Sequence, residues 1–119
     1  MIFEINDYSS MQDAITRFCL FLTQNKVPDE RVFDSRLVAS ELVGNVLRHA
    51  QGRAKLHGEI RGGFVELSVF SSVAYTPPKT VEKADLFAEH GRGLYLVDSL
   101  CYSRTTTKDG GILVRIRME

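Results

Sequence analysis

Three polar residues recur at intervals of four in the stretch SELVGNVLRHA, which covers residues 40–50. They are Glu41, Asn45 and His49, and the apolar residues around them have helical spacing. In a helix each member of such a series shifts by about 40°, so the row runs along the apolar side and then enters it. Burying part of a carboxylate and an amide is costly unless they find partners. Any one of the three alone would be explained by an ordinary hydrogen bond to the backbone, but three in register favour a functional site.

The chemistry available to this row is specific. A carboxylate beside an apolar wall can have a raised pKa and can polarise a hydroxyl or a water. An amide oxygen one turn away can ligate Mg²⁺, a hard cation that keeps several waters and shares phosphate oxygens. Gly44 costs the helix about 1 kcal/mol relative to alanine, but it allows a backbone or a ligand to approach closely. We expect Ser40, Gly44 and Arg48 to form the solvent-facing side. The combination suits a nucleoside triphosphate.

A second motif, Gly91-Arg92-Gly93-Leu94, directly precedes the apolar stretch LYLVDSL, which we expect to be a short helix. The exposed N–H groups and the positive dipole end of a helix start attract anions. Glycines let a phosphate come close to the backbone, and Arg92 could add a charged contact. On its own such a glycine pair usually marks a turn. Its interpretation as a phosphate-binding motif is stronger here because the pair follows the polar row and a long loop.

The elements that must position these motifs follow from periodicity, caps and turns. We expect a strand over 2–6, a helix over Met11–Gln24 capped by Ser9 or Ser10, and a helix from a cap at Asp29 to His49 or Ala50, closed by Gln51-Gly52. We expect strands over 54–60, 64–70, 102–107 and 112–118, with turns at Arg61-Gly62-Gly63 and at 108–111. Residues 71–90 lose periodicity and form a long loop, which in a small domain is often functional. The order predicts one α+β domain over 1–119, a two-layer sandwich with helices on a mostly antiparallel mixed sheet.

The two motifs together resemble those of the GHKL (Bergerat-fold) ATPases, which include the histidine kinase-like ATPase domains. The row from Glu41 through Asn45 to His49 resembles the N-box of that superfamily, and the glycine pair resembles its second glycine box. The trailing histidine and the short chain are similar to the anti-sigma factor serine kinases. The resemblance covers roughly residues 9–118. It implies a bacterial protein that binds ATP and Mg²⁺, with residues 71–90 as a lid over the nucleotide.

The resemblance also implies roles for particular residues. Glu41 would be the general base or would position the attacking group, and Asn45 would hold Mg²⁺. The remaining nucleotide contacts would come from His49, Ser71, Gly91, Arg92, Gly93 and Leu94. The implied protein partners are an anti-sigma antagonist carrying a serine, or a sigma factor, and a homodimer is a reasonable assembly.

Two of the four expected motifs depart from the pattern. The family normally has an Asp-x-Gly-x-Gly box after the central strand, where the aspartate bonds the adenine amino group. By alternation Ser71 occupies the place of that aspartate, and Val73 replaces the first glycine. Losing a charge-assisted bond costs about 1.5–3 kcal/mol. In the last hairpin Ile112 and Leu113 stand where the family often has a threonine.

Composition excludes several other classes of protein. Fifteen Lys and Arg balance fifteen Asp and Glu, whereas a non-specific nucleic-acid binder needs a basic excess. No apolar run reaches the roughly 18 residues of a membrane span, and the N-terminal segment does not have the pattern of a secretory signal. Cys19 and Cys101 each lie in an apolar stretch, which predicts reduced, buried thiols in a cytoplasmic protein. No Cys/His cluster has the spacing of a structural zinc site.

Two further hypotheses stay open beside an ATP-binding kinase or ATPase. One is a protein-binding module that has lost catalysis and binds nucleotide weakly or not at all, as the missing aspartate suggests. The other is a metal-dependent hydrolase, whose ligands would have to come from Glu41, His49 and the distant His90. The second fits less well because nothing else clusters with those residues.

Overall fold

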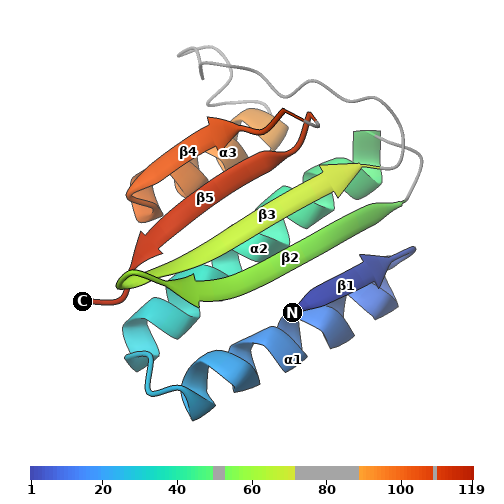
Figure 1. The fold of residues 1–119 in the computed structure, drawn as a ribbon. Helices are drawn as coiled ribbons and strands as arrows, with labels where there is room; N and C mark the ends of the chain where they lie inside the picture. The colour runs from blue at the N-terminus through green and yellow to red at the C-terminus, as the bar shows by residue number, and fades with distance from the viewer. Residues whose placement is uncertain (50–52, 72–88, 109) are drawn as a thin grey trace.

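The computed structural model describes residues 1–49, 53–71, 89–108 and 110–119. Five strands form one sheet in the order β1-β2-β3-β5-β4, and each neighbouring pair is antiparallel. The three helices of the described part, α1, α2 and α3, cover one face of this sheet (Figure 1). The architecture confirms the α+β sandwich, with antiparallel pairing throughout the described strands. The elements are β1 Ile2–Ile5, α1 Tyr8–Gln24, α2 Asp29–His49, β2 Ala54–Arg61, β3 Phe64–Ser71, α3 Glu89–Leu100, β4 Ser103–Thr106 and β5 Ile112–Arg117.

The core lies between the sheet and α2, the helix that occupies the middle of the helical layer. This helix packs on α1, on α3 and on three strands, β2, β3 and β5. Its Val38, Leu42 and Val46 are buried, and Leu67 and Val114 are buried on the facing side of the sheet. Alternation along each strand therefore leaves one face of the sheet for the core. Among the described helices, none is both long and apolar enough to cross a membrane.

The start of α1 differs from the sequence prediction. Asp7, not Ser9 or Ser10, is the N-cap, and its carboxylate accepts a bond of 2.7 Å from the Ser10 backbone N–H. The Ser10 hydroxyl in turn accepts a bond of 3.1 Å from the Asp7 backbone N–H. This reciprocal capping box satisfies donors at both positions, so the helix begins earlier than a single serine cap would allow.

The bounds of α2 match the prediction at its end but not at its beginning. The helix ends at His49, as expected, and residues 50–52 with the expected closing Gln51-Gly52 lie outside the described part. Asp29 is the first helical residue and not the cap. The Pro28 carbonyl already accepts bonds from the N–H groups of Arg31 and Val32, at 2.9 and 3.0 Å. A carboxylate within the first turn still interacts favourably with the helix dipole.

The two hairpins form where turn residues predict them. Gly62 and Gly63 both have positive φ, 59° and 82°, the conformation that a two-residue hairpin turn requires and that glycine adopts without strain. The register pairs Ser71 with Ala54 and places it on the face of Leu67 and Val69, which confirms the alternation argument. The final strands, at 103–106 and 112–117, are slightly shorter than expected.

The long segment between β3 and α3 is described only at its margins. Ser71 belongs to β3, and Glu89 and His90 belong to α3, so the expected loop over 71–90 is shorter at both ends. Residues 72–88, which include most of the expected lid, lie outside the described part of the chain.

A glycine in the sheet fixes how closely α1 approaches it. The Phe18 side chain is fully buried, and its ring lies directly against Gly58 of β2. A Cβ at position 58 would come within 2.4 Å of a carbon of that ring. The aromatic ring therefore fills the space that any other residue at position 58 would need for its side chain.

We expect Gly58→Ala to lower the free energy of unfolding by about 1–3 kcal/mol, because the core must shift to admit the extra carbon. Urea unfolding of the variant and the wild type would measure the loss. The control is the same substitution in a Phe18→Leu background, where the ring is absent and the loss should shrink. An equal loss in both backgrounds would exclude the ring contact as the cause.

The cap of α1 predicts a pH dependence of stability. The bonds from Ser10 hold the pKa of Asp7 below its usual value of 3.8. A carboxyl whose pKa is lower in the folded state stabilises the fold above its unfolded-state pKa, and this stabilisation is lost as the pH falls through the folded-state pKa. Asn at position 7 keeps a cap acceptor but does not titrate.

The melting temperature of the wild type minus that of Asp7→Asn should therefore increase as the pH is raised from about 2 to about 5. The matched control is Asp13→Asn, an exposed α1 carboxylate paired with Arg17. If both variants showed the same change with pH relative to the wild type, the cap would not be its source.

Candidate functional site

The predicted polar row lies along the edge of the buried side of α2. Glu41 is half-buried, and Asn45 has only 3% of its surface exposed. Their neighbours Leu42 and Val46 are buried in the core. His49 is the last residue of α2, and its side chain lies outside the described part. The structure therefore confirms that a carboxylate and an amide border the core, as the helical spacing predicts.

Arg48 is the partner of the buried amide. Its Nη2 donates a hydrogen bond to the Oδ1 of Asn45, three residues earlier on the same helix. This bond satisfies an acceptor whose burial would otherwise be costly. The sequence analysis placed Arg48 on the solvent side and missed this contact. The signal was available, because residues at i and i+3 are neighbours on a helix surface.

The prediction of a solvent-facing side formed by Ser40, Gly44 and Arg48 was wrong for one of its members. Arg48 is exposed and Ser40 is half-buried, but Gly44 is buried. The physical reason is that α2 is flanked by α1 and α3 as well as by the sheet. More of its circumference is covered than in a helix that packs on one side only.

The glycine pair lies inside α3 and not before it. The helix begins at Glu89, so Gly91 is its third residue and Gly93 its fifth. Only the first four N–H groups of a helix lack an intrahelical partner. The prediction that both glycines precede the helix was therefore wrong, because both lie within its bounds.

The flanking residues of this motif have different surroundings. Leu94 is only 1% exposed and belongs to the core, so its side chain anchors α3. The Arg92 side chain lies outside the described part. An ion pair holds the other half of α3 to the sheet. The Arg104 guanidinium of β4 binds both carboxylate oxygens of Asp98, at 2.6 and 3.0 Å, with 13% of the arginine side chain exposed.

The structure brings the parts of the predicted site toward one end of the sheet. The end of β3 with Ser71, the end of α2 and the beginning of α3 lie toward the same end of the molecule (Figure 1). Both β3 and α3 pack on α2. The Asn45 amide, the Ser71 hydroxyl and the start of α3 thus belong to neighbouring elements, as a single cleft for an extended ligand requires.

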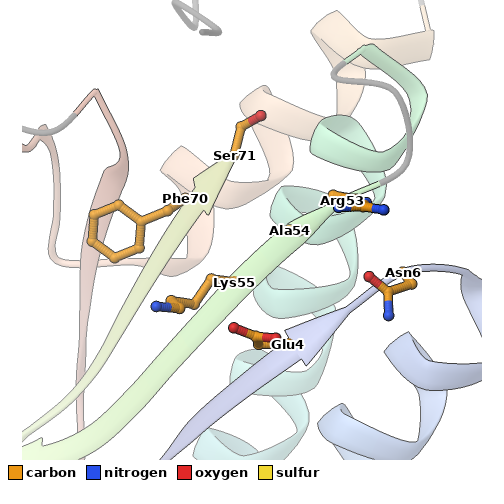
Figure 2. Close-up of a pocket in the computed structure, with 7 residues that line it drawn as sticks. All are labelled: Glu4, Asn6, Arg53, Ala54, Lys55, Phe70 and Ser71. Carbon is orange, nitrogen blue, oxygen red and sulfur yellow. The ribbon is translucent and has the colours of Figure 1, made fainter. Parts of the chain in front are cut away.

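A cavity of about 520 Å³ lies at this end of the sheet but mostly on its other face. Lys55 alternates with the buried Ala54 and Leu56, so it points away from the helices. Phe70 likewise alternates with Ser71, and Figure 2 shows the two side chains pointing to different sides. The cavity therefore shares Ser71 with the predicted site but not the polar row. Its lining residues are Glu4, Asn6, Arg53, Ala54, Lys55, Phe70 and Ser71.

The described residues also bear on the hydrolase hypothesis and on the two cysteines. No group of three or more His, Cys, Asp or Glu is arranged to hold a metal ion in that part of the chain. The side chains of His49 and His90, which the hydrolase hypothesis needs, lie outside it. Cys19 and Cys101 are free thiols, the first buried and the second half-buried, and burial raises the pKa of both.

Comparison with known proteins agrees with this geometry. The family model described as the histidine kinase-like ATPase domain matches residues 6–118. The chain belongs to this family. No curated protein matches the chain. This match to the family model supports the GHKL resemblance of the sequence at the level of the superfamily. Domains of the family bind ATP, generally with Mg²⁺. The departures at Ser71 and Ile112 are thus variations within a histidine kinase-like ATPase domain.

Proposed function

We propose that this protein binds Mg²⁺ and ATP at the end of the sheet where α2, β3 and α3 meet, and that it acts as a bacterial regulatory protein kinase of the anti-sigma type. The observation that carries this proposal is the Asn45 amide. It is almost fully buried, it lies next to the half-buried Glu41, and its oxygen faces a cation. Phosphates would lie between this wall and the first N–H groups of α3.

The residues present fit a magnesium ion. The Oδ1 of Asn45 is an oxygen ligand of the hard kind that Mg²⁺ prefers. It already accepts a hydrogen bond from the Arg48 guanidinium, so this position favours a positive charge. A site with one protein oxygen suits Mg²⁺, which completes its shell with phosphate oxygens and waters. When bound, the ion would neutralise charge on the phosphates. Glu41 would remain available for the nucleophile.

In the kinase step that we propose, one bond to phosphorus forms as another breaks. A serine hydroxyl of the substrate forms a bond to the γ-phosphorus, and the bond from that phosphorus to the β–γ bridging oxygen breaks to release ADP. The hydroxyl proton passes to the Glu41 carboxylate and from there to solvent. Phosphoryl transfer depends mainly on positioning and charge neutralisation, so the residues that hold the phosphates should matter most.

The protein partners belong to the same proposal. The anti-sigma kinases that the sequence resembles act on an antagonist that carries a serine, and they bind a sigma factor. We propose such a pair of partners for this protein, which would work in the cytoplasm, with a homodimer as the reasonable assembly. The support is the resemblance of the N-box, its trailing His49 and the short chain.

A second function is favoured by one specific observation. Ser71 occupies the helix-facing position at the end of β3 where the family's adenine-binding aspartate is expected. A neutral hydroxyl replaces a charged acceptor there, which weakens recognition of the base. The alternative is therefore a protein-binding module that keeps the fold and has lost useful affinity for nucleotide.

Calorimetric titration of ATP separates these two functions. We expect binding that depends on Mg²⁺ and is at least tenfold weaker in Asn45→Ala, because the variant loses a metal ligand. Asn25→Ala is the matched control, since this asparagine is exposed at the C-terminal end of α1 and its side-chain amide donates to the Phe21 carbonyl. Absence of heat at millimolar ATP, with a normal melting curve, would leave the protein-binding module as the function.

A second prediction concerns Ser71, the residue proposed to contact the adenine. Ser71→Asp should tighten ATP binding by about 10-fold or more, because a charge-assisted bond to the adenine amino group contributes about 1.5–3 kcal/mol. Guanine has an oxygen where adenine has this amino group, so GTP binding should not improve. A variant that bound both nucleotides equally better, or neither, would show that position 71 does not contact the base.

A further inference from the structure

We propose that the Arg48 guanidinium occupies the metal-binding oxygen of Asn45 in the nucleotide-free protein, and that Mg²⁺ must displace it. This inference rests on the proposed ATP site and adds a residue that sets its dependence on Mg²⁺. In the structure Nη2 of Arg48 donates to Oδ1 of Asn45, the atom that would face the metal ion. Arg48 therefore competes with Mg²⁺ for this oxygen.

The local geometry shows why an arginine can reach this oxygen. Arg48 follows Asn45 by three residues, so the two side chains share one side of α2. Gly44 lies between the guanidinium and the helix axis. A Cβ at position 44 would be 3.5 Å from Nη1 of Arg48, an ordinary contact distance. The guanidinium thus lies over the glycine, close enough that a Cβ there would make only an ordinary contact with it.

Burial gives the bond a structural role when no nucleotide is bound. Asn45 is 3% exposed, so water has little access to satisfy its oxygen. A buried acceptor without a partner destabilises the fold, and a charged donor is an especially strong partner. Arg48 supplies that donor from the exposed rim of α2. The site is therefore stable without a metal ion, because a side chain provides positive charge in its place.

Electrostatics makes the two cations exclusive at this atom. A guanidinium and Mg²⁺ on one amide oxygen would lie only a few ångströms apart, where like charges repel strongly outside bulk water. The Arg48 guanidinium would therefore have to leave this oxygen for Mg²⁺ to bind it.

The experiment follows the Mg²⁺ concentration needed for nucleotide binding. A non-hydrolysable ATP analogue is held at fixed concentration, Mg²⁺ is titrated, and binding is measured by calorimetry. We expect the half-saturating Mg²⁺ concentration to fall by about fivefold or more in Arg48→Ala, because the competitor is gone. Arg48→Gln tests the same point with a neutral donor that spares the fold, and it should shift in the same direction.

The control is Arg17→Ala, which removes one positive charge from an exposed position on α1 and should leave the half-saturating concentration unchanged. A second readout needs no nucleotide. The side-chain amide signal of Asn45 in ¹H–¹⁵N spectra should move in Arg48→Ala, and millimolar MgCl₂ should then perturb it more than in the wild type.

The outcomes are distinguishable from failure of the proposed function. Preserved analogue binding with the same Mg²⁺ dependence in the wild type and both Arg48 variants would overturn this inference and leave the ATP site standing. A wild type that binds no analogue at any Mg²⁺ concentration would overturn both. A lowered half-saturating concentration in Arg48→Gln and Arg48→Ala, but not in Arg17→Ala, supports the competition.

Discussion

The burial of α2 on several sides is the constraint on which the rest of the structure depends. This helix packs on three strands and on the two other helices of the described residues, so it has little surface left for solvent. Leu42, Val43 and Val46 are buried within it. A helix in this position cannot carry polar side chains freely, because each one must find a partner at the boundary of the core. The placement of Glu41 and Asn45 is costly by default, which is why it indicates a site.

The same constraint explains the role of the guanidinium. Asn45 is almost fully buried, so its oxygen needs a donor. The Arg48 guanidinium provides one. Under our proposal a metal ion would replace it when nucleotide binds, and the buried oxygen would then keep a positively charged partner.

The two ends of the proposed site are built from elements of different kinds. The phosphate end uses helices, α2 and the beginning of α3, and the ion pair of Asp98 with Arg104 together with the buried Leu94 anchors α3 to the rest of the domain. The base end uses Ser71, the half-buried last residue of a strand. Under our proposal a substitution there would change the affinity for the base more than it would change the core. Loss of the aspartate is therefore compatible with the family's fold.

The sequence by itself determined the helix–sheet architecture, the hairpin at Gly62-Gly63 and the row from Glu41 to Asn45, because these follow from periodicity and local backbone preference. Alternation alone also gave the face of Ser71. Only the tertiary structure decided that Gly44 is buried and that Asp98 pairs with Arg104, because both depend on how α3 packs beside α2 and the sheet. It also decided that Asp7 caps α1, that α3 begins at Glu89 and that Arg48 holds Asn45. Each of these is a choice among neighbouring donors and acceptors that spacing allows equally, and the packing of the whole chain selects one.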